Sequence, residues 1–364
     1  MSRLLHPAAV AALAVAAALI VGLLLAGLAG ADPLTTVSAL VEGMLGTPYA
    51  IGESLNGVAV LMLVAAGFVI AYRAGLVNVG GEGQLCAGGI AATAIGTGLP
   101  AGTPAFVALP AVLVAAGFAW AAVPAALRAW RGTSEIITTL LLNFVGLALV
   151  TLMVHEEGLL RQPVTSSETL PQSAPLVEGA HLPELGLSRS PATVGIVVAV
   201  VALVAVGILL RHTGTGLRLT AVGHAPEAAA RLGVPVARAR FLALGGAGAF
   251  AGVAGGMLVA TAPYVLAEGF TSGYGFSGLV VGLLARGSMT ALAAVAVLLG
   301  FLVSGGINLQ LVAGVPATTV SIVESLIILF IAGSAAWAAR RRAALRAPAP
   351  RPAATQAETV GAER

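Results

Sequence analysis

Long apolar stretches separated by short polar segments run along most of the chain. A helix needs roughly 20 apolar residues to cross the ~30 Å hydrocarbon core of a bilayer. The pattern therefore predicts an all-α fold, a polytopic transmembrane helical bundle with about 10 spans. The third and eighth stretches are short and rich in glycine, so counts of nine or eight spans stay open. The stretches lie near residues 7–29, 55–72, 84–99, 105–127, 136–154, 192–210, 240–262, 272–285, 290–309 and 317–338.

The same pattern predicts one membrane domain over residues 1–338 and a disordered basic cytoplasmic tail over residues 339–364. The first apolar run is 23 residues long, whereas the apolar core of a signal peptide has about 7–15. We therefore expect an uncleaved anchor there, with a signal peptide as the alternative. In the tail, Arg340 to Arg342 would lie against the anionic inner leaflet.

Arginine placement gives the orientation of the predicted spans. With a cytoplasmic N-terminus, 16 arginines fall on the inner side and only Arg161 and Arg189 on the outer side. This bias is the one that positive-inside topology requires. We expect a multi-pass protein of the cytoplasmic (inner) membrane with both termini cytoplasmic, in contact with membrane lipid.

An even number of spans also allows two halves of opposite orientation. Ten spans split five plus five would form an inverted repeat, an arrangement found in transporters. On that split, the glycine-rich segment 78–84 would correspond to the glycine-rich segment 269–275. The inverted repeat is held as an alternative, because the two segments match weakly.

Composition narrows the function classes. Of the 364 residues, 58% are hydrophobic and only 9% are charged, against about 25% charged in soluble domains. This excludes a soluble enzyme and a nucleic-acid binder. All 18 basic residues are arginine, and the phosphate-binding pattern G-x-x-x-x-G-K-[ST] needs a lysine. We expect no cofactor on this chain, so any ATP would be bound by a partner subunit.

A first polar segment interrupts the apolar pattern at residues 72–84, Y-R-A-G-L-V-N-V-G-G-E-G-Q. A broken helix exposes backbone groups that are tolerated at membrane depth only beside protein or a cavity. Asn78, Glu82 and Gln84 bring hydrogen-bonding groups to this break. The alternative interpretation is a solvated turn.

A second segment, residues 220–233, predicts a short helix in an inner loop that spans about residues 211–239. Pro226 suits a first helical turn, Glu227 complements the helix dipole there, and Gly233 is placed to end the helix. Such a capped helix could dock a soluble partner. An ordinary solvated loop is the alternative.

Further polar groups lie inside the spans. Glu135, Thr139 and Asn143 have i, i+4, i+8 spacing and share one helix face. Glu324 stands alone in the last span, where an ionisable group is costly and usually functional. A helix start at Glu135 and interhelical hydrogen bonding by Asn143 are the structural alternatives. The five histidines show no metal-ligand spacing, and we find no grouping of residues that predicts an enzyme.

Four segments together resemble the permease subunits of bacterial ABC importers for simple sugars, nucleosides and branched-chain amino acids. Residues 72–84 are similar to the family's R-A-G-L-F-N-I-G-A-E-G-Q, and residues 132–144 to its G-x-N-E-V-I-x-T-L-M-L-N-Y. Residues 221–229 are similar to A-V-G-x-N-P-E-A-A, and residues 273–278 to the start of G-Y-G-F-x-G-I-A-V-A-L-L-G. The G-x-E-G-Q form is most similar to nucleoside-type members.

The resemblance implies a complex of two permease chains, identical or different, with two cytoplasmic ABC ATPase subunits and an extracytoplasmic substrate-binding protein. Residues 221–233 would be the coupling helix that docks on the ATPase. The residues assigned to coupling are Gly223, Pro226, Glu227, Ala228, Ala229, Arg231 and Gly233. The residues assigned to the substrate path are Asn78, Glu82, Gln84, Asn143, Tyr274, Asn308 and Glu324.

The chain departs from the family pattern at several positions. Gly81 replaces an alanine, Ala225 replaces an asparagine suited to helix capping, and Glu324 stands where glutamine is common. We expect an alternating-access importer of a small polar solute, a nucleoside or a simple sugar. The alternative is a stand-alone secondary transporter coupled to protons through Glu324 or Glu82.

Overall fold

The structure, a computed structural model, describes residues 32–100, 109–165 and 169–314, together with residues 20–24, 26, 27, 30, 322, 325 and 326. In this part the chain is helical, with three isolated β-bridges and no strand, which confirms the all-α class. The elements are α2 (Pro33–Val41), η1 (Glu42–Gly46), α3 (Pro48–Arg73), α4 (Gly81–Gly96), α5 (Leu109–Arg131), α6 (Glu135–His155), η3 (Glu178–Ala180), α7 (Gly195–His212), α8 (Gly214–His224), α9 (Pro226–Arg231), α10 (Val236–Val259), α11 (Tyr274–Ala285) and α12 (Met289–Ala313).

Eight of the predicted spans each correspond to one helix, namely α3 to α7 and α10 to α12. Six of these are long and apolar enough to cross a membrane, whereas α4 and α11 have only 16 and 12 residues. The predicted spans 7–29 and 317–338 lie largely outside the described residues, and the predicted tail 339–364 lies entirely outside them. The sequence pattern did not predict α2 or the π-helical turn η1 that follows it.

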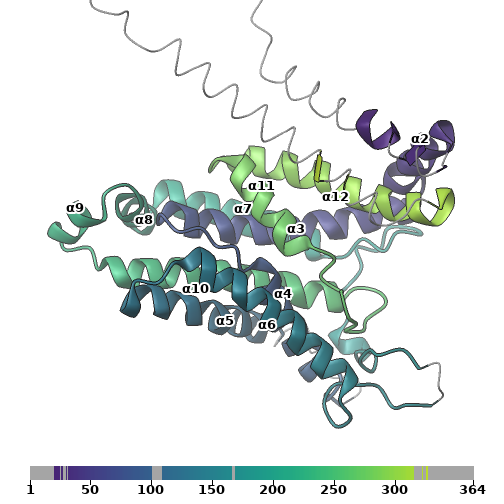
Figure 1. The fold of residues 1–364 in the computed structure, drawn as a ribbon, viewed down its shortest axis with the longest axis horizontal. Helices are drawn as coiled ribbons and strands as arrows, with labels where there is room; N and C mark the ends of the chain where they lie inside the picture. The colour runs from purple at the N-terminus through teal and green to yellow at the C-terminus, as the bar shows by residue number, and fades with distance from the viewer. Residues whose placement is uncertain are drawn as a thin grey trace, which may run out of the picture.

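Two helices form the centre of the bundle. In its most apolar window, α3 is 89% buried, and α10 is 67% buried, against 22% for α6. α3 contacts α7, α10, α11 and α12, while α10 contacts α4 and α5 (Figure 1). The largest cluster of buried apolar side chains therefore follows α3 and extends into its neighbours.

The outer helices turn their apolar faces outward. On α6, Ile137, Leu141 and Phe144 are exposed, whereas Thr139 and Asn143 are buried. Lipid tails are as apolar as leucine, so a helix in a bilayer gains little by burying leucine and more by burying polar groups against protein. This inverted amphipathicity supports a membrane location.

Close packing of α10 depends on glycine. Gly248, Gly252 and Gly256 recur every fourth residue, which places them on one face. A Cβ atom at Gly252 would lie 2.7 Å from the Cα of Gly117 on α5, and one at Gly248 would meet the carbonyl oxygen of Gly117. Small residues at this spacing let two backbones approach closely, the usual source of helix association in lipid.

The bundle has two distinct ends (Figure 1). α8 and α9 lie at one end, and α2 lies at the other. Residues 169–194 pack against the end of α4 and the loop that follows α10. Val177 N–H donates to the carbonyl of Gly96 at 2.9 Å, and Leu182 N–H to that of Ala260 at 2.8 Å.

We predict that Gly252→Ala destabilises the protein by about 1–3 kcal/mol, the usual cost of overpacking a filled interior. Gly246→Ala is the matched control on the same helix, because a Cβ there meets nothing within 4 Å. Thermal unfolding of the detergent-purified chain measures the difference. Equal transition temperatures for the two variants would contradict the close packing of α5 on α10.

Candidate functional site: a buried polar junction and an adjacent cavity

The two short helices, α4 and α11, begin beside each other inside the bundle. α3 ends in a Schellman turn, in which Leu76 N–H donates to the carbonyl of Ala71 at 3.1 Å and Gly75 has φ +76°. This left-handed glycine sends residues 76–80 back into the bundle. There, a Cβ at Gly81 would lie only 2.7 Å from the carbonyl oxygen of Gly275.

α4 is capped by a side chain from another helix. The residue before α4 is Gly80, which has no side chain to cap it. Instead, Oδ1 of Asn143 on α6 accepts from the N–H of Gly83 at 2.9 Å, and its Nδ2 donates to the carbonyl of Val79 at 2.8 Å. Thr139, one turn earlier on α6, accepts from Val79 N–H at 3.2 Å. The polar face of α6 therefore holds the broken segment in place.

Asn78 and Gln84 form a buried pair of side-chain amides. Asn78 Nδ2 donates to Gln84 Oε1 at 2.9 Å, and Gln84 Nε2 donates to Asn78 Oδ1 at 3.1 Å. Both residues are at most 5% exposed. A reciprocal pair satisfies groups that would each be costly to bury alone. It also closes the turn between the returning chain and α4.

Glu82 supplies the cap for α11. The preceding residue of α11, Gly273, also lacks a side chain. Glu82 Oε1 accepts from the N–H of Gly275 at 3.0 Å and from that of Phe276 at 3.4 Å, and Glu82 is only 2% exposed. A carboxylate at a helix N-terminus is worth about 0.3–1 kcal/mol, and up to about 2 kcal/mol when partly buried. The N-terminal ends of α4 and α11 both favour a negative charge here.

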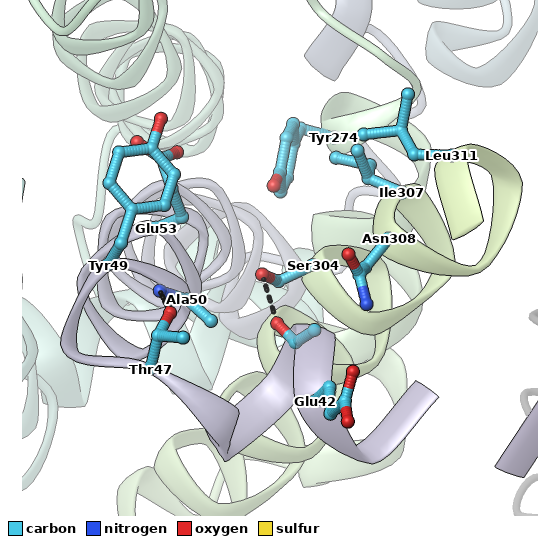
Figure 2. Close-up of a pocket in the computed structure, with 11 residues that line it drawn as sticks. Glu42, Thr47, Tyr49, Ala50, Glu53, Tyr274, Ser304, Ile307, Asn308 and Leu311 are labelled. Atoms are coloured by element: carbon cyan, nitrogen blue, oxygen red, sulfur yellow. Dashed lines mark hydrogen bonds between the residues drawn. The ribbon is translucent and has the colours of Figure 1, made fainter. Parts of the chain in front are cut away.

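A cavity of about 410 Å³ lies next to this junction, toward the α2 end of the bundle. Figure 2 shows Tyr49 and Glu53 on its α3 side, and Tyr274, Ser304 and Asn308 on its α11 and α12 side. The lining residues are Glu42, Gly43, Thr47, Tyr49, Ala50, Glu53, Tyr274, Ser304, Ile307, Asn308 and Leu311.

Two polar residues of α12 in the cavity wall hydrogen-bond to α2 and η1, the two elements that the sequence pattern did not predict. Asn308 Nδ2 donates to the carbonyl of Ala39 at 2.7 Å, and Ser304 Oγ donates to that of Gly43 at 2.9 Å. Both acceptors lie in α2 or η1, where the chain leaves regular α-helical hydrogen bonding. This arrangement lets the irregular backbone form one wall of a polar cavity.

The structure divides the predicted path residues into two groups. Tyr274 and Asn308 line the cavity, whereas Asn78, Glu82, Gln84 and Asn143 lie in the buried junction and do not line it. Glu324 lies outside the described residues. Most of the cavity-lining residues were not predicted, among them Glu42, Tyr49, Glu53 and Ser304. The i, i+4 spacing of Tyr49 and Glu53 at the start of an apolar helix was a signal that could have been followed.

The predicted short helix near residue 226 is present as α9. Val234 N–H donates to the carbonyl of Ala229 at 3.0 Å, and Gly233 has φ +81°, so a Schellman turn ends the helix as its glycine indicated. Ala225 makes no side-chain cap, in agreement with its departure from the family pattern. Leu232, which the sequence analysis did not single out, is 84% exposed at the tip.

The rest of the predicted coupling segment shows which of its residues face outward. Glu227, Ala228 and Arg231 are exposed, whereas Ala229 is buried. Gly223, at the end of α8, packs against the carbonyl oxygen of Arg73. Glu135, at the start of α6, pairs with Arg128 at 3.3 Å, which supports its interpretation as a helix-start charge.

A helical bundle with inward polar groups, a polar cavity and a short helix at one end is typical of a membrane transport protein. Residues 50–332 match the family described as the branched-chain amino acid transport system / permease component. The chain belongs to this family.

Relatives of known activity give the class of transporter. A guanosine ABC transporter permease of Bacillus subtilis (strain 168) is 32% identical over 92% of this chain and 94% of its own length. A glucose ABC transporter permease of Haloferax volcanii is 32% identical over 88% of this chain and 85% of its own length. A nucleoside ABC transporter permease of Lactococcus lactis subsp. cremoris is 30% identical over 83% of this chain and 84% of its own length. No solved structure matches the chain significantly.

The chain is therefore an integral membrane permease subunit of an ABC importer and not an enzyme. This confirms the resemblance given by the four motifs. Permeases of this family work with an ATPase and a substrate-binding protein. The alternative hypothesis of a proton-coupled secondary transporter is not supported, because the relatives are ABC transporter permeases.

We predict that Asn143→Ala loosens the junction, because it removes two hydrogen bonds and leaves the buried groups of Gly83 and Val79 unpaired. Each unpaired group costs about 1–3 kcal/mol. Hydrogen exchange of the amides at residues 79–83 should accelerate. Thr138→Ala is the control on α6, since Thr138 bonds only carbonyls of its own helix, and unchanged exchange in Asn143→Ala would contradict the capping role.

Proposed function

We infer that this permease carries a nucleoside or a simple sugar across the bacterial inner membrane through the cavity between η1, α3, α11 and α12. The cavity carries the inference, because its volume falls within the range of about 300–1,000 Å³ typical of small-molecule sites. Its lining combines carboxylates, hydroxyls, an amide and aromatic rings. The relatives described above are named as permeases for guanosine, glucose and nucleosides.

The cavity chemistry favours a polyhydroxylated solute with a flat face. Glu42 and Glu53 supply carboxylates that accept hydrogen bonds from sugar hydroxyls, and such charge-assisted bonds are stronger than neutral ones. The rings of Tyr49 and Tyr274 offer surfaces for stacking a base. A nucleoside uses both kinds of group, whereas a simple sugar uses mainly the first.

Transport would proceed by alternating access, with ATP bound and hydrolysed by a separate subunit. We assign docking of that ATPase to α9 and the adjoining coupling residues, at the end of the bundle opposite the cavity. The partners would be a second permease chain, the ATPase pair and an extracytoplasmic binding protein that delivers solute at the α2 end. Both termini would then be cytoplasmic.

The proposal includes ten spans in a 5+5 inverted repeat. α3 packs on α11 and α12 as well as on α10, and α10 packs on α4 and α5 in the corresponding way. The short helices α4 and α11 meet at their N-termini and are each capped from elsewhere in the bundle. These correspondences support a pseudo-two-fold axis through the contact of Gly81 with Gly275.

The substrate assignment is tested by uptake in proteoliposomes that contain the permease, its ATPase and its binding protein, with nucleosides, pentoses and amino acids as solutes. We expect nucleosides or sugars to be taken up and amino acids not to be. Glu53→Gln should raise KM about tenfold or more, since a hydrogen bond to a charged group contributes about 1.5–3 kcal/mol. Uptake of amino acids alone would overturn the assignment.

A paired substitution tests the cavity wall itself. A Cβ at Gly57 would lie 2.6 Å from the hydroxyl oxygen of Tyr274, so Gly57→Ala should push the ring into the cavity and reduce uptake. Adding Tyr274→Phe removes the oxygen and should restore part of the lost uptake. No recovery in the double variant would remove Tyr274 from the path.

The docking assignment is tested at the tip of α9. Leu232→Ser should weaken ATPase association about tenfold or more, because burying a leucine at an interface contributes about 1.5–3 kcal/mol. Leu170→Ser is the matched control, an exposed leucine outside the α8–α9 end. Co-purification and titration of the ATPase measure the effect, and equal affinities would contradict docking at α9.

A further inference from the structure

A continuous set of contacts links the α8 end of the bundle to the cavity. At one end, a Cβ on Gly223 would meet the carbonyl oxygen of Arg73 and lie 3.0 Å from the nitrogen of Gly75. The chain then runs through residues 76–80 to Glu82, within the first turn of α4. Glu82 binds the first turn of α11, whose first residue is the cavity residue Tyr274.

The start of α11 is fixed on more than one side by this arrangement. Glu82 accepts from two successive amides of α11, at 3.0 and 3.4 Å. The backbone of α11 also lies directly against that of α4, because Gly81 and Gly275 both lack a Cβ. A Cβ at Gly275 would meet the backbone nitrogen of Glu82. A movement of the first turn of α4 must therefore move the first turn of α11.

We propose that Glu82 is a positioning residue for transport. It connects the first turn of α11, which begins at Tyr274, to residues 73–82, the segment that α8 contacts. The inference rests on the proposed function, since it assigns Tyr274 to the solute path. Glu82 itself is buried outside the cavity and does not touch the solute. A displacement of α8 that follows ATPase movement passes through residues 73–82 to the first turn of α11 and so to one wall of the cavity.

The first experiment separates positioning from solute contact. Glu82→Ala, Glu82→Gln and the control Cys86→Ala are compared in the reconstituted complex. Cys86 lies one turn along α4 and is equally buried. Uptake and ATP hydrolysis are both normalised to the amount of folded complex.

Glu82→Ala should reduce maximal uptake about tenfold or more, because it removes two hydrogen bonds to a charged group. ATP hydrolysis should fall much less, so more ATP is consumed per solute moved. Glu82→Gln keeps an acceptor oxygen and should recover part of the coupling, whereas Cys86→Ala should match the parent chain. A raised KM with unchanged ATP consumption per solute would place Glu82 in the solute path and overturn the proposal.

The second experiment needs no solute. Hydrogen exchange of the Gly275 and Phe276 amides is followed in the full complex in nanodiscs. We expect faster exchange in Glu82→Ala than in Cys86→Ala and an intermediate rate in Glu82→Gln. Equal rates in all three variants would overturn the positioning role. A complex that moves neither nucleoside nor sugar, but shows this order of rates, would instead count against the proposed function alone.

A third comparison tests the distal end of the contacts. Gly223→Ala introduces a methyl group against Arg73, whereas a Cβ at Gly214, also on α8, meets nothing within 4 Å. Gly223→Ala should raise ATP consumption per solute in the same direction as Glu82→Ala, and Gly214→Ala should not. A proportional loss of hydrolysis and uptake in Gly223→Ala would show impaired docking and would overturn the connection through Arg73.

Discussion

A helix that starts inside an apolar bundle must have its first N–H groups satisfied by protein, because neither water nor lipid can do so. α4 and α11 both start in this way, and each is preceded by a glycine that cannot cap it. The caps come from other helices: Asn143 for α4 and Glu82 for α11. The arrangement of the bundle centre follows from these two interactions, since each fixes the position of one helix relative to another.

This constraint also explains why the interior contains so much glycine. Two helix N-termini can lie side by side only if their backbones approach closely, and Gly81 and Gly275 permit that approach. Close packing elsewhere, as between α10 and α5, likewise relies on small residues. The large apolar side chains lie instead on the outer faces of helices such as α6. These faces are the ones that a bilayer would cover.

The sequence predicted the features that depend on local signals. Pro226 and Gly233 indicated a short helix, and α9 lies between them. The apolar stretches around α4 and α11 were counted among the ten predicted spans, and their shortness was the signal that left counts of nine or eight open. Other features depend on residues far apart in the chain: Glu82 and Gly275 are separated by 193 positions. The residues around each of them do not indicate that they meet, so the capping of α11 by Glu82 was not predicted. α2 and η1 were missed because they are short, with nine and five residues. Their hydrogen bonds with Asn308 and Ser304 also join residues far apart in the chain.

The division between junction and cavity changes how the polar residues of this chain are interpreted. A polar side chain buried in a membrane bundle can either contact solute or cap a helix. The two roles differ in whether the side chain hydrogen-bonds to the solute or to protein. In the junction, the hydrogen bonds of Asn78, Glu82 and Asn143 are made to protein groups, and Oε2 of Glu82 is buried without a hydrogen-bond partner among the described residues. In the cavity, the carboxylates of Glu42 and Glu53 face a volume large enough for one. A permease needs a junction and a cavity close together, because a residue in the cavity wall moves only if it is connected to a helix that moves. Tyr274 meets that condition, since its side chain lines the cavity and the amides that follow it are bound by Glu82.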